Sequence, residues 1–384
     1  MEAYFDNSAT TKVLDSVKDI MIRTMTEDYA NAAAKHSKGM EAERYIKDAA
    51  SVLAGTLKVQ PKEIVFTSGG SEANNLALIG AAMANQRTGK HMITTAIEHP
   101  SVYRPLQMLA EQGFEITYLP VDREGHISLE ELAGAIRPDT ILVSTMYVNN
   151  EVGAVEPVAA IGALIKQKNP ATLYHVDAIQ AYGKYLIRPK KMKIDLLSVS
   201  AHKIHGPKGA GFLYINTGVK IKPLIYGGGQ QAGMRAGTEN VPGAAGMAAA
   251  AKELYDHHRE LTEHLCGLKD YMIGQLSALE EVTVNSSKGE AGAPQIVSAS
   301  FAGVRSEVLL HALEERQIYV SSGSACSSNH PGISGTLKGI GLKQELQDST
   351  LRFSFGIFNT REEIDYCIGV LKELLPVLRR YRRG

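Results

Sequence analysis

Short apolar segments alternate with helical segments between residues 63 and 200, and this alternation restricts the fold more than any other feature. The predicted strands are residues 63–67, 91–96, 114–119, 140–147, 173–176 and 194–200, and the predicted helices are 71–84, 101–112, 129–136 and 158–168. The pattern predicts an α/β fold with a mainly parallel sheet covered by helices. Sheets of this type bind ligands at the carboxyl ends of their strands.

The chain of 384 residues is too long for one simple core, so we expect two domains. We predict a large domain over residues 14–258 and a smaller α+β domain formed by residues 1–13 and 259–384. Two helices, over residues 13–29 and 41–57, precede the alternating region, and a long helix over 241–258 closes the large domain. The small domain has predicted strands at 295–301, 318–321 and 351–355, and predicted helices at 306–316 and 362–380.

Composition excludes several classes of protein. Lys plus Arg and Asp plus Glu both count 41, so the net charge is zero and we expect neither direct nucleic-acid binding nor membrane-surface binding. No apolar run reaches the length of a membrane helix, and the amino terminus does not have the pattern of a signal peptide, so we expect a cytoplasmic protein. The three cysteines, Cys266, Cys326 and Cys367, are widely spaced, so we expect no metal site.

Lys203 lies where a predicted strand ends. Residues 198–211 run from small and apolar residues into His202 and Lys203, then into a glycine-rich turn that leads to a return strand at 211–215. A lysine held against a strand end is partly desolvated, which makes it a candidate for Schiff-base chemistry. A simple surface turn is the alternative.

Other strand ends carry complementary groups. Gly70 and Ser71 open a helix directly after a strand, so their free N–H groups predict a phosphate site, with ordinary side-chain capping as the alternative. Asp177 ends a strand and could keep a pyridine nitrogen protonated, or could cap the next helix. His99 could stack on an aromatic ring and move protons, or could be a loop histidine. Together with Lys203 these groups predict a site for pyridoxal 5'-phosphate.

Six short motifs carry a family resemblance. They are residues 4–11, 66–75, 148–151, 175–177, 200–203 and 321–328, the last of which reads Ser-Ser-Gly-Ser-Ala-Cys-Ser-Ser. In these motifs the chain resembles the cysteine desulfurases of the class V aminotransferase family, which are pyridoxal phosphate enzymes of fold type I. The resemblance covers nearly the whole chain and implies a homodimer.

The resemblance also implies roles for individual residues. Lys203 would be the Schiff-base lysine, Asp177 would contact the pyridine nitrogen, Gln180 the ring hydroxyl, and His99 would stack on the ring and act in catalysis. The cofactor phosphate would be held by Gly70, Ser71, Ser200 and His202, and by Thr238 from the second subunit. Asn7, Asn150 and Arg352 would bind the substrate, and Asn150 would also contact the cofactor.

Cys326 would be the nucleophile of the reaction. It lies among Ser, Gly and Ala residues, a composition typical of a loop, whereas we expect Cys266 and Cys367 to be buried in helices. By the resemblance, its thiolate takes sulfur from L-cysteine, which leaves a persulfide and L-alanine. An acceptor protein in iron–sulfur cluster assembly or tRNA thiolation would receive the sulfur. A selenocysteine lyase, another class V enzyme and a non-catalytic scaffold are the alternatives.

One segment departs from the family pattern. Many relatives carry Gly-Asn-Pro-Ser-Ser-x-His after the first helix, whereas residues 29–36 of this chain read Tyr-Ala-Asn-Ala-Ala-Ala-Lys-His. The proline and the serines are missing, so the family pattern does not predict the backbone conformation of this segment.

Overall fold

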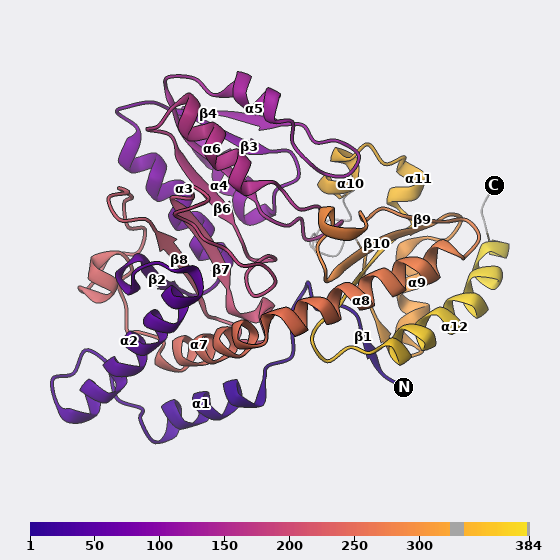
Figure 1. The fold of residues 1–384 in the computed structure, drawn as a ribbon, viewed down its shortest axis with the longest axis horizontal. Coiled ribbons are helices and arrows are strands. Elements are labelled where there is room, and N and C mark those ends of the chain that lie inside the picture. The colour runs from indigo at the N-terminus through magenta and orange to yellow at the C-terminus, as the bar shows by residue number, and fades with distance from the viewer. Residues whose placement is uncertain (323–333, 382–384) are drawn as a thin grey trace.

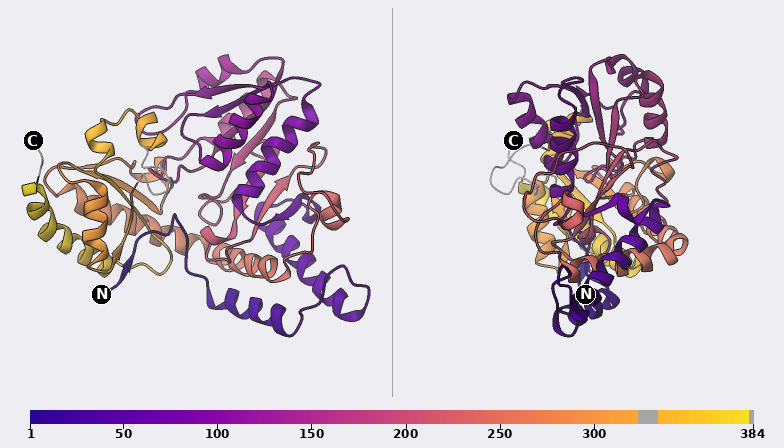
Figure 2. Two further views of the ribbon diagram at one scale, coloured as in Figure 1. Left: turned by 180° about the vertical axis from the view of Figure 1, so that it is seen from behind. Right: turned by 90° about the vertical axis from the view of Figure 1, so that its left-hand side faces the viewer.

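The computed structural model describes residues 1–322 and 334–381, so the predicted nucleophile Cys326 lies outside the described residues. A larger α/β part and a smaller α+β part lie side by side, and the long helix α8 (His258–Ser277) runs from one to the other (Figures 1 and 2). The amino terminus lies at the smaller part (Figure 1). No helix in the described ranges is long and apolar enough to cross a membrane.

A seven-stranded sheet forms the centre of the larger part. Its order is β2 (Ile64–Thr67), β8 (Gly211–Ile215), β7 (Leu196–Ser200), β6 (Leu173–Asp177), β5 (Thr140–Met146), β3 (His91–Thr95) and β4 (Glu115–Leu119). Strands β7, β6, β5, β3 and β4 pair in parallel, whereas β8 is antiparallel to both of its neighbours. The predicted α/β class with a mainly parallel sheet is confirmed.

Helices bury both faces of this sheet. The helices α3 (Gly70–Asn85) and α4 (Pro100–Glu111) pack on one face, and α2 (Ser37–Leu57), α5 (Leu129–Ala135), α6 (Val158–Lys168) and α7 (Val241–Asp256) pack on the other. The helix α1 (Asp15–Thr26) packs against α7. The side chains of neighbouring strand residues point alternately into the apolar cores on the two faces of the sheet. Leu142 belongs to the core with α3 and α4, and Val143 belongs to the core on the other face. This burial on both sides explains the continuous apolar runs in the sequence.

The smaller part is built on antiparallel pairing. Its sheet has the order β12 (Ser321–Ser322), β13 (Thr350–Ser354), β10 (Ile296–Phe301) and β9 (Val282–Val284), and β1 (Ala3–Tyr4) pairs in parallel with β11 (Ile318–Tyr319). The helices are α8, α9 (Ser306–Glu314), α10 (Gly335–Gly339), α11 (Gln344–Gln347) and α12 (Arg361–Leu378). Phe5 belongs to the same core as Phe301 and Phe353. The domain boundaries at residues 13/14 and 258/259 stay a prediction.

The structure tests two local predictions, namely where α2 begins and whether Cys266 and Cys367 are buried. The departing segment 29–36 ends in a cap, because His36 Nδ1 accepts the N–H of Gly39 at 3.2 Å and α2 therefore begins at Ser37, earlier than predicted. Cys367 is buried in α12, as predicted. The prediction of a buried Cys266 is wrong: on α8 the neighbouring Leu265 faces the core and leaves Cys266 exposed.

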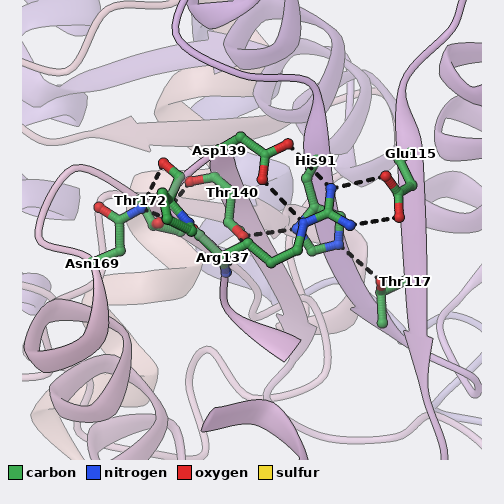
Figure 3. Close-up of polar contacts among 9 residues, drawn as sticks. His91, Glu115, Thr117, Arg137, Asp139, Thr140, Asn169 and Thr172 are labelled. Carbon is green, nitrogen blue, oxygen red and sulfur yellow. Dashed lines mark hydrogen bonds and ion pairs between the residues drawn. The ribbon is translucent and has the colours of Figure 1, made fainter. Parts of the chain in front are cut away.

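Charged and polar side chains close the amino-terminal edge of the sheet (Figure 3). Arg137 donates to both carboxylate oxygens of Glu115, at 2.6 and 2.8 Å, and to both of Asp139, at 3.0 and 3.1 Å. Beside it, the ring nitrogens of His91 contact the hydroxyls of Thr140 and Thr117 at 2.7 and 2.8 Å. These groups satisfy one another, so this edge is suited to stability rather than to binding.

At the opposite edge of the sheet, formed by the carboxyl ends of the parallel strands, the buried polar atoms are not all paired. Several buried polar atoms there have no hydrogen-bond partner among the described residues: Ser8 Oγ, Asn74 Oδ1, Glu98 Oε2 and Arg352 Nε. Buried polar atoms are almost always paired in folded proteins, so each of these atoms needs a partner such as an ordered water or a bound ligand.

Candidate active site

One cavity of about 270 Å³ lies at the carboxyl ends of the parallel strands. Its walls contain most of the residues predicted from the sequence: Gly70, Ser71, His99, Asn150, Asp177, Gln180, Ser200, His202, Lys203 and Arg352. The sequence analysis did not name the other lining residues, among them Ser8, Ala9 and Ser101. The parallel register explains the convergence, because strands far apart in the sequence end at the same edge of the sheet.

The amino terminus of α3 forms one wall of the cavity. Gly69 is the N-cap residue, with a φ of 148° that favours glycine, and no side chain among the described residues caps the helix. The alternative of ordinary capping by Ser68 or Ser71 is therefore wrong. A Cβ added at Gly70 would clash with the Ile179 side chain, so this helix position has room only for glycine. The uncapped first turn and its dipole favour an anion.

Asp177 is a buried carboxyl group at the end of β6, and it is only 5% exposed. Its Oδ1 accepts the N–H of Ile179 at 3.0 Å, and its Oδ2 accepts from Asn74 Nδ2 at 2.8 Å. Burial raises the pKa of Asp177, whereas these two hydrogen bonds and the neighbouring His99 and Lys203 side chains oppose the rise. The carboxyl group therefore shapes the local turn and also faces the cavity.

His99 caps α4 and lines the cavity. Its Nδ1 accepts the N–H of Ser101 at 3.1 Å, so the neutral ring carries its proton on Nε2. Burial lowers the pKa of His99 and favours this neutral form. Ser101 Oγ contacts the same nitrogen at 2.8 Å and accepts from Asn74 Nδ2 at 2.9 Å.

Asn74 thus connects Asp177 to His99 through Ser101. The sequence analysis assigned no role to Asn74 or Ser101. The available signal was their position, because Asn74 lies inside the motif that begins α3 and Ser101 follows His99 by two residues.

We predict that Asn74→Ala weakens cofactor binding about 10- to 100-fold. The substitution removes a hydrogen bond to a buried carboxylate, which typically contributes about 1.5–3 kcal/mol. The measurement is the Kd for pyridoxal phosphate by absorbance titration. The matched control is Asn75→Ala, since within the described ranges the Asn75 amide bonds to Ser71 O of its own helix, at 2.8 Å, and to no active-site residue. Equal Kd values for the two variants would contradict the prediction.

Lys203 is placed by a short turn, η2 (Ala201–Lys203), that directly follows β7. Its Nζ donates to the carbonyl oxygens of Ser8 and Ala9, the latter at 2.7 Å. Gln180 Nε2 donates to the same Ser8 carbonyl at 3.0 Å. The amino-terminal segment therefore crosses the cavity beside Lys203, and the surface-turn alternative is wrong.

His202 lies beside Lys203 in the same turn. Its Nδ1 lies 3.3 Å from Thr10 Oγ1, so it also contacts the amino-terminal segment. Burial, together with the positive charge of Lys203, lowers the pKa of His202 to about 4. The ring is therefore neutral at neutral pH and suits a hydrogen bond rather than an ion pair.

Arg352 reaches the cavity from β13 of the smaller part. It is 6% exposed, its Nη1 donates to the Asn150 carbonyl at 2.8 Å, and its Nη2 forms an ion pair with Asp6 at 2.8 Å. Its Nε has no partner among the described residues. A planar guanidinium with a remaining donor suits a carboxylate ligand. The sequence analysis did not identify Asp6.

Three predicted residues lie outside this cavity or outside the described structure. The amide nitrogen of Asn7 donates to Ser354 O and to Asn359 Oδ1, both at 3.0 Å, and Asn7 lines a smaller neighbouring cavity. Thr238 is exposed and does not line the cavity. Cys326 lies outside the described residues. The roles of all three stay predictions.

Glu98 precedes His99 and connects two strand ends. Its Oε1 accepts from Thr95 Oγ1 at 2.8 Å and from the N–H of Met146 at 2.9 Å. Burial raises the pKa of Glu98 to about 8, so the group is mostly protonated at neutral pH. A neutral carboxylic acid can link β3 to β5 without placing a second full charge near Asp177.

Comparison with known proteins shows the family to which the chain belongs. The family described as aminotransferase class-V matches residues 3–367, and the chain belongs to this family. The curated cysteine desulfurase IscS of Clostridium botulinum (strain Hall) is 43% identical over 376 residues, which cover 97% of this chain and 94% of that protein. The cysteine desulfurase IscS of Escherichia coli O139:H28 is 42% identical over 393 residues, with 99% and 96% covered.

A solved structure described as a NifS-like protein superimposes with a TM-score of 0.93. It is 38% identical, and the alignment covers 98% of this chain and 100% of that one. The family predicted from the sequence motifs is therefore confirmed, together with the fold.

Proposed function

We propose that the chain is a pyridoxal-phosphate-dependent cysteine desulfurase, which converts L-cysteine to L-alanine and passes the sulfur on. One observation carries the proposal: Lys203, Asp177, His99 and the uncapped start of α3 line the same cavity. The relatives named cysteine desulfurase support the choice of reaction, since they match this chain over nearly its whole length.

The residues present fit the cofactor. The uncapped turn at Gly70 and Ser71 suits a phosphate, the buried carboxyl group of Asp177 suits a protonated pyridine nitrogen, and the amine of Lys203 suits an aldehyde. When bound, pyridoxal phosphate supplies an electron sink. The Ser8 and Ala9 carbonyls hold the Lys203 amine in the cavity, where it can move protons to and from a substrate.

Arg352 and Asn150 bind the substrate carboxylate in this proposal. The unpartnered Nε of Arg352 donates to the carboxylate, while the ion pair with Asp6 holds the guanidinium plane. His99 would stack on the cofactor ring when it is bound, and Asn74 and Ser101 hold the imidazole in place.

Cys326 takes the sulfur. A bond forms between its thiolate sulfur and the substrate sulfur, and the carbon–sulfur bond of the substrate breaks, with its electron pair remaining on carbon. Protonation of that carbon gives L-alanine, and Cys326 keeps the sulfur as a persulfide. An acceptor protein, or a thiol reductant in the test tube, then removes this sulfur.

The assembly and the partners belong to the same proposal. The protein forms a homodimer in which Thr238 reaches the phosphate of the other subunit, and it delivers sulfur to a protein of iron–sulfur cluster assembly or tRNA thiolation. A location in the cytoplasm stays a prediction.

The test is product formation by the purified protein supplied with pyridoxal phosphate. We expect equal amounts of L-alanine and sulfide from L-cysteine in the presence of a thiol reductant. L-Selenocysteine as the exclusive substrate would favour the lyase alternative, and amino transfer to a 2-oxo acid would favour an aminotransferase. A protein that binds no cofactor and forms no alanine would overturn the proposal.

A further inference from the structure

Lys184 is a second lysine at the site that no proposed catalytic step uses. It lies in the turn after β6, and its Nζ donates to the backbone carbonyl of Lys203 at 2.6 Å. Gly183 before it has a φ of 82° and donates its N–H to the Tyr255 hydroxyl at 3.3 Å. The backbone turn therefore points the Lys184 side chain at Lys203, whose amine is the proposed reactive group.

The smaller cavity beside the active site contains this lysine. Lys184 and Lys203 both line it, together with Gln180, His205, Leu254 and Leu265, which come from both parts of the molecule. This cavity shares Lys203 and Gln180 with the larger cavity but does not include Gly70 or Ser71, so the two cavities adjoin at Lys203. Lys184 contacts the Lys203 backbone at this junction.

The surroundings of Lys184 leave its charge uncompensated. No carboxylate lies within ion-pair distance of its Nζ in the part of the chain that the structure describes. The titratable and charged groups around it are Lys203, His202 and His205 on the turn after β7, and His258 on α8. Tyr255 on α7 contacts the preceding Gly183, and Arg188 acts on His258. Burial, with the positive charge of Lys203, lowers the pKa of Lys184 to about 7.

We propose that Lys184 is a positioning residue for Lys203: it holds the Lys203 carbonyl and, through its positive charge, lowers the proton affinity of the Lys203 side-chain nitrogen. The inference rests on the proposed function, since it concerns the bond between Lys203 and the cofactor aldehyde. Two like charges in a poorly solvated region disfavour each other, so Lys184 acts in this way below about pH 7, where it keeps its own proton. A shift of one pKa unit is a tenfold change in proton affinity.

The test is a pH titration of the visible absorption band of the cofactor-loaded protein. This band reports protonation of the nitrogen that joins Lys203 to the cofactor and does not require turnover. For Lys184→Met we expect the apparent pKa of the band to rise by about one unit, because the neighbouring positive charge is gone. For Lys184→Arg, which keeps a charge at every pH, we expect an apparent pKa at or below that of the unaltered protein.

Lys208→Met is the matched control. Lys208 is an exposed lysine in the same glycine-rich turn, and we expect its removal to leave the apparent pKa within about 0.2 units, since solvent screens exposed charges. A Lys184→Met protein that titrates like the unaltered protein would overturn the inference. If Lys184→Met does not fold, Lys184→Arg decides, because a rise in its apparent pKa would overturn the charge effect. An unaltered protein with no visible band would instead count against the proposed function.

Discussion

Lys203→Ala is expected to reduce alanine formation from L-cysteine by at least about a thousandfold. In the proposed function, the Lys203 amine at the end of β7 bonds to the cofactor and moves protons, and losing a positioned proton-transfer group typically costs about 10²- to 10⁴-fold. Borohydride reduction followed by mass spectrometry measures the bond directly. We expect the unaltered protein to gain the mass of the cofactor and the variant to gain none.

Lys208→Ala is the control for this prediction. It removes an exposed lysine from the same turn and is expected to retain both the covalent mass and the activity. A Lys203→Ala protein that still gains the cofactor mass after reduction would show that another lysine forms the bond.

Cys326→Ala is expected to abolish sulfur release, again by at least about a thousandfold, while the cofactor still binds and still bonds to Lys203. Removing the nucleophile of a covalent mechanism leaves binding intact but removes the acceptor of the sulfur atom. The assay measures sulfide and alanine together, and an absorbance spectrum verifies that the cofactor is present. This prediction comes from the sequence motif, since Cys326 lies outside the described residues.

The exposed Cys266 supplies the comparison. Cys266→Ala removes a solvent-accessible thiol on α8 and is expected to leave activity unchanged, so a loss confined to Cys326→Ala identifies the acceptor. Unchanged turnover in Cys326→Ala would contradict the proposed route of the sulfur.

Local patterns in the sequence were sufficient for the fold class and for much of the cavity wall. Runs such as 173–176 and 194–200 predicted buried parallel strands, and the groups directly after them, Asp177 and Lys203, were expected at one edge. The structure places both in the same cavity. The prediction succeeded because the carboxyl ends of parallel strands all lie at the same edge of a sheet, so a residue that directly follows such a strand lies at that edge.

Side-chain orientation was less predictable. The burial of Cys266 was predicted wrongly, because one position along a helix separates the buried Leu265 from an exposed residue. The start of α2 was also missed, since it depends on the His36 ring accepting the Gly39 N–H. The exact helix face of one side chain and a single capping hydrogen bond cannot be predicted from the spacing of apolar residues.

The strand ends, the groups that follow them and the family could be predicted from local patterns in the amino-acid sequence. The distant groups that hold those residues in place could be identified only in the folded chain. The Asp6–Arg352 ion pair joins residues 346 positions apart, Asn74 reaches Asp177 across 103 positions, and the Lys203 amine finds its carbonyl partners 194 and 195 positions away. Such contacts arise when separately folded segments pack together, and local periodicity carries no information about which segments will meet.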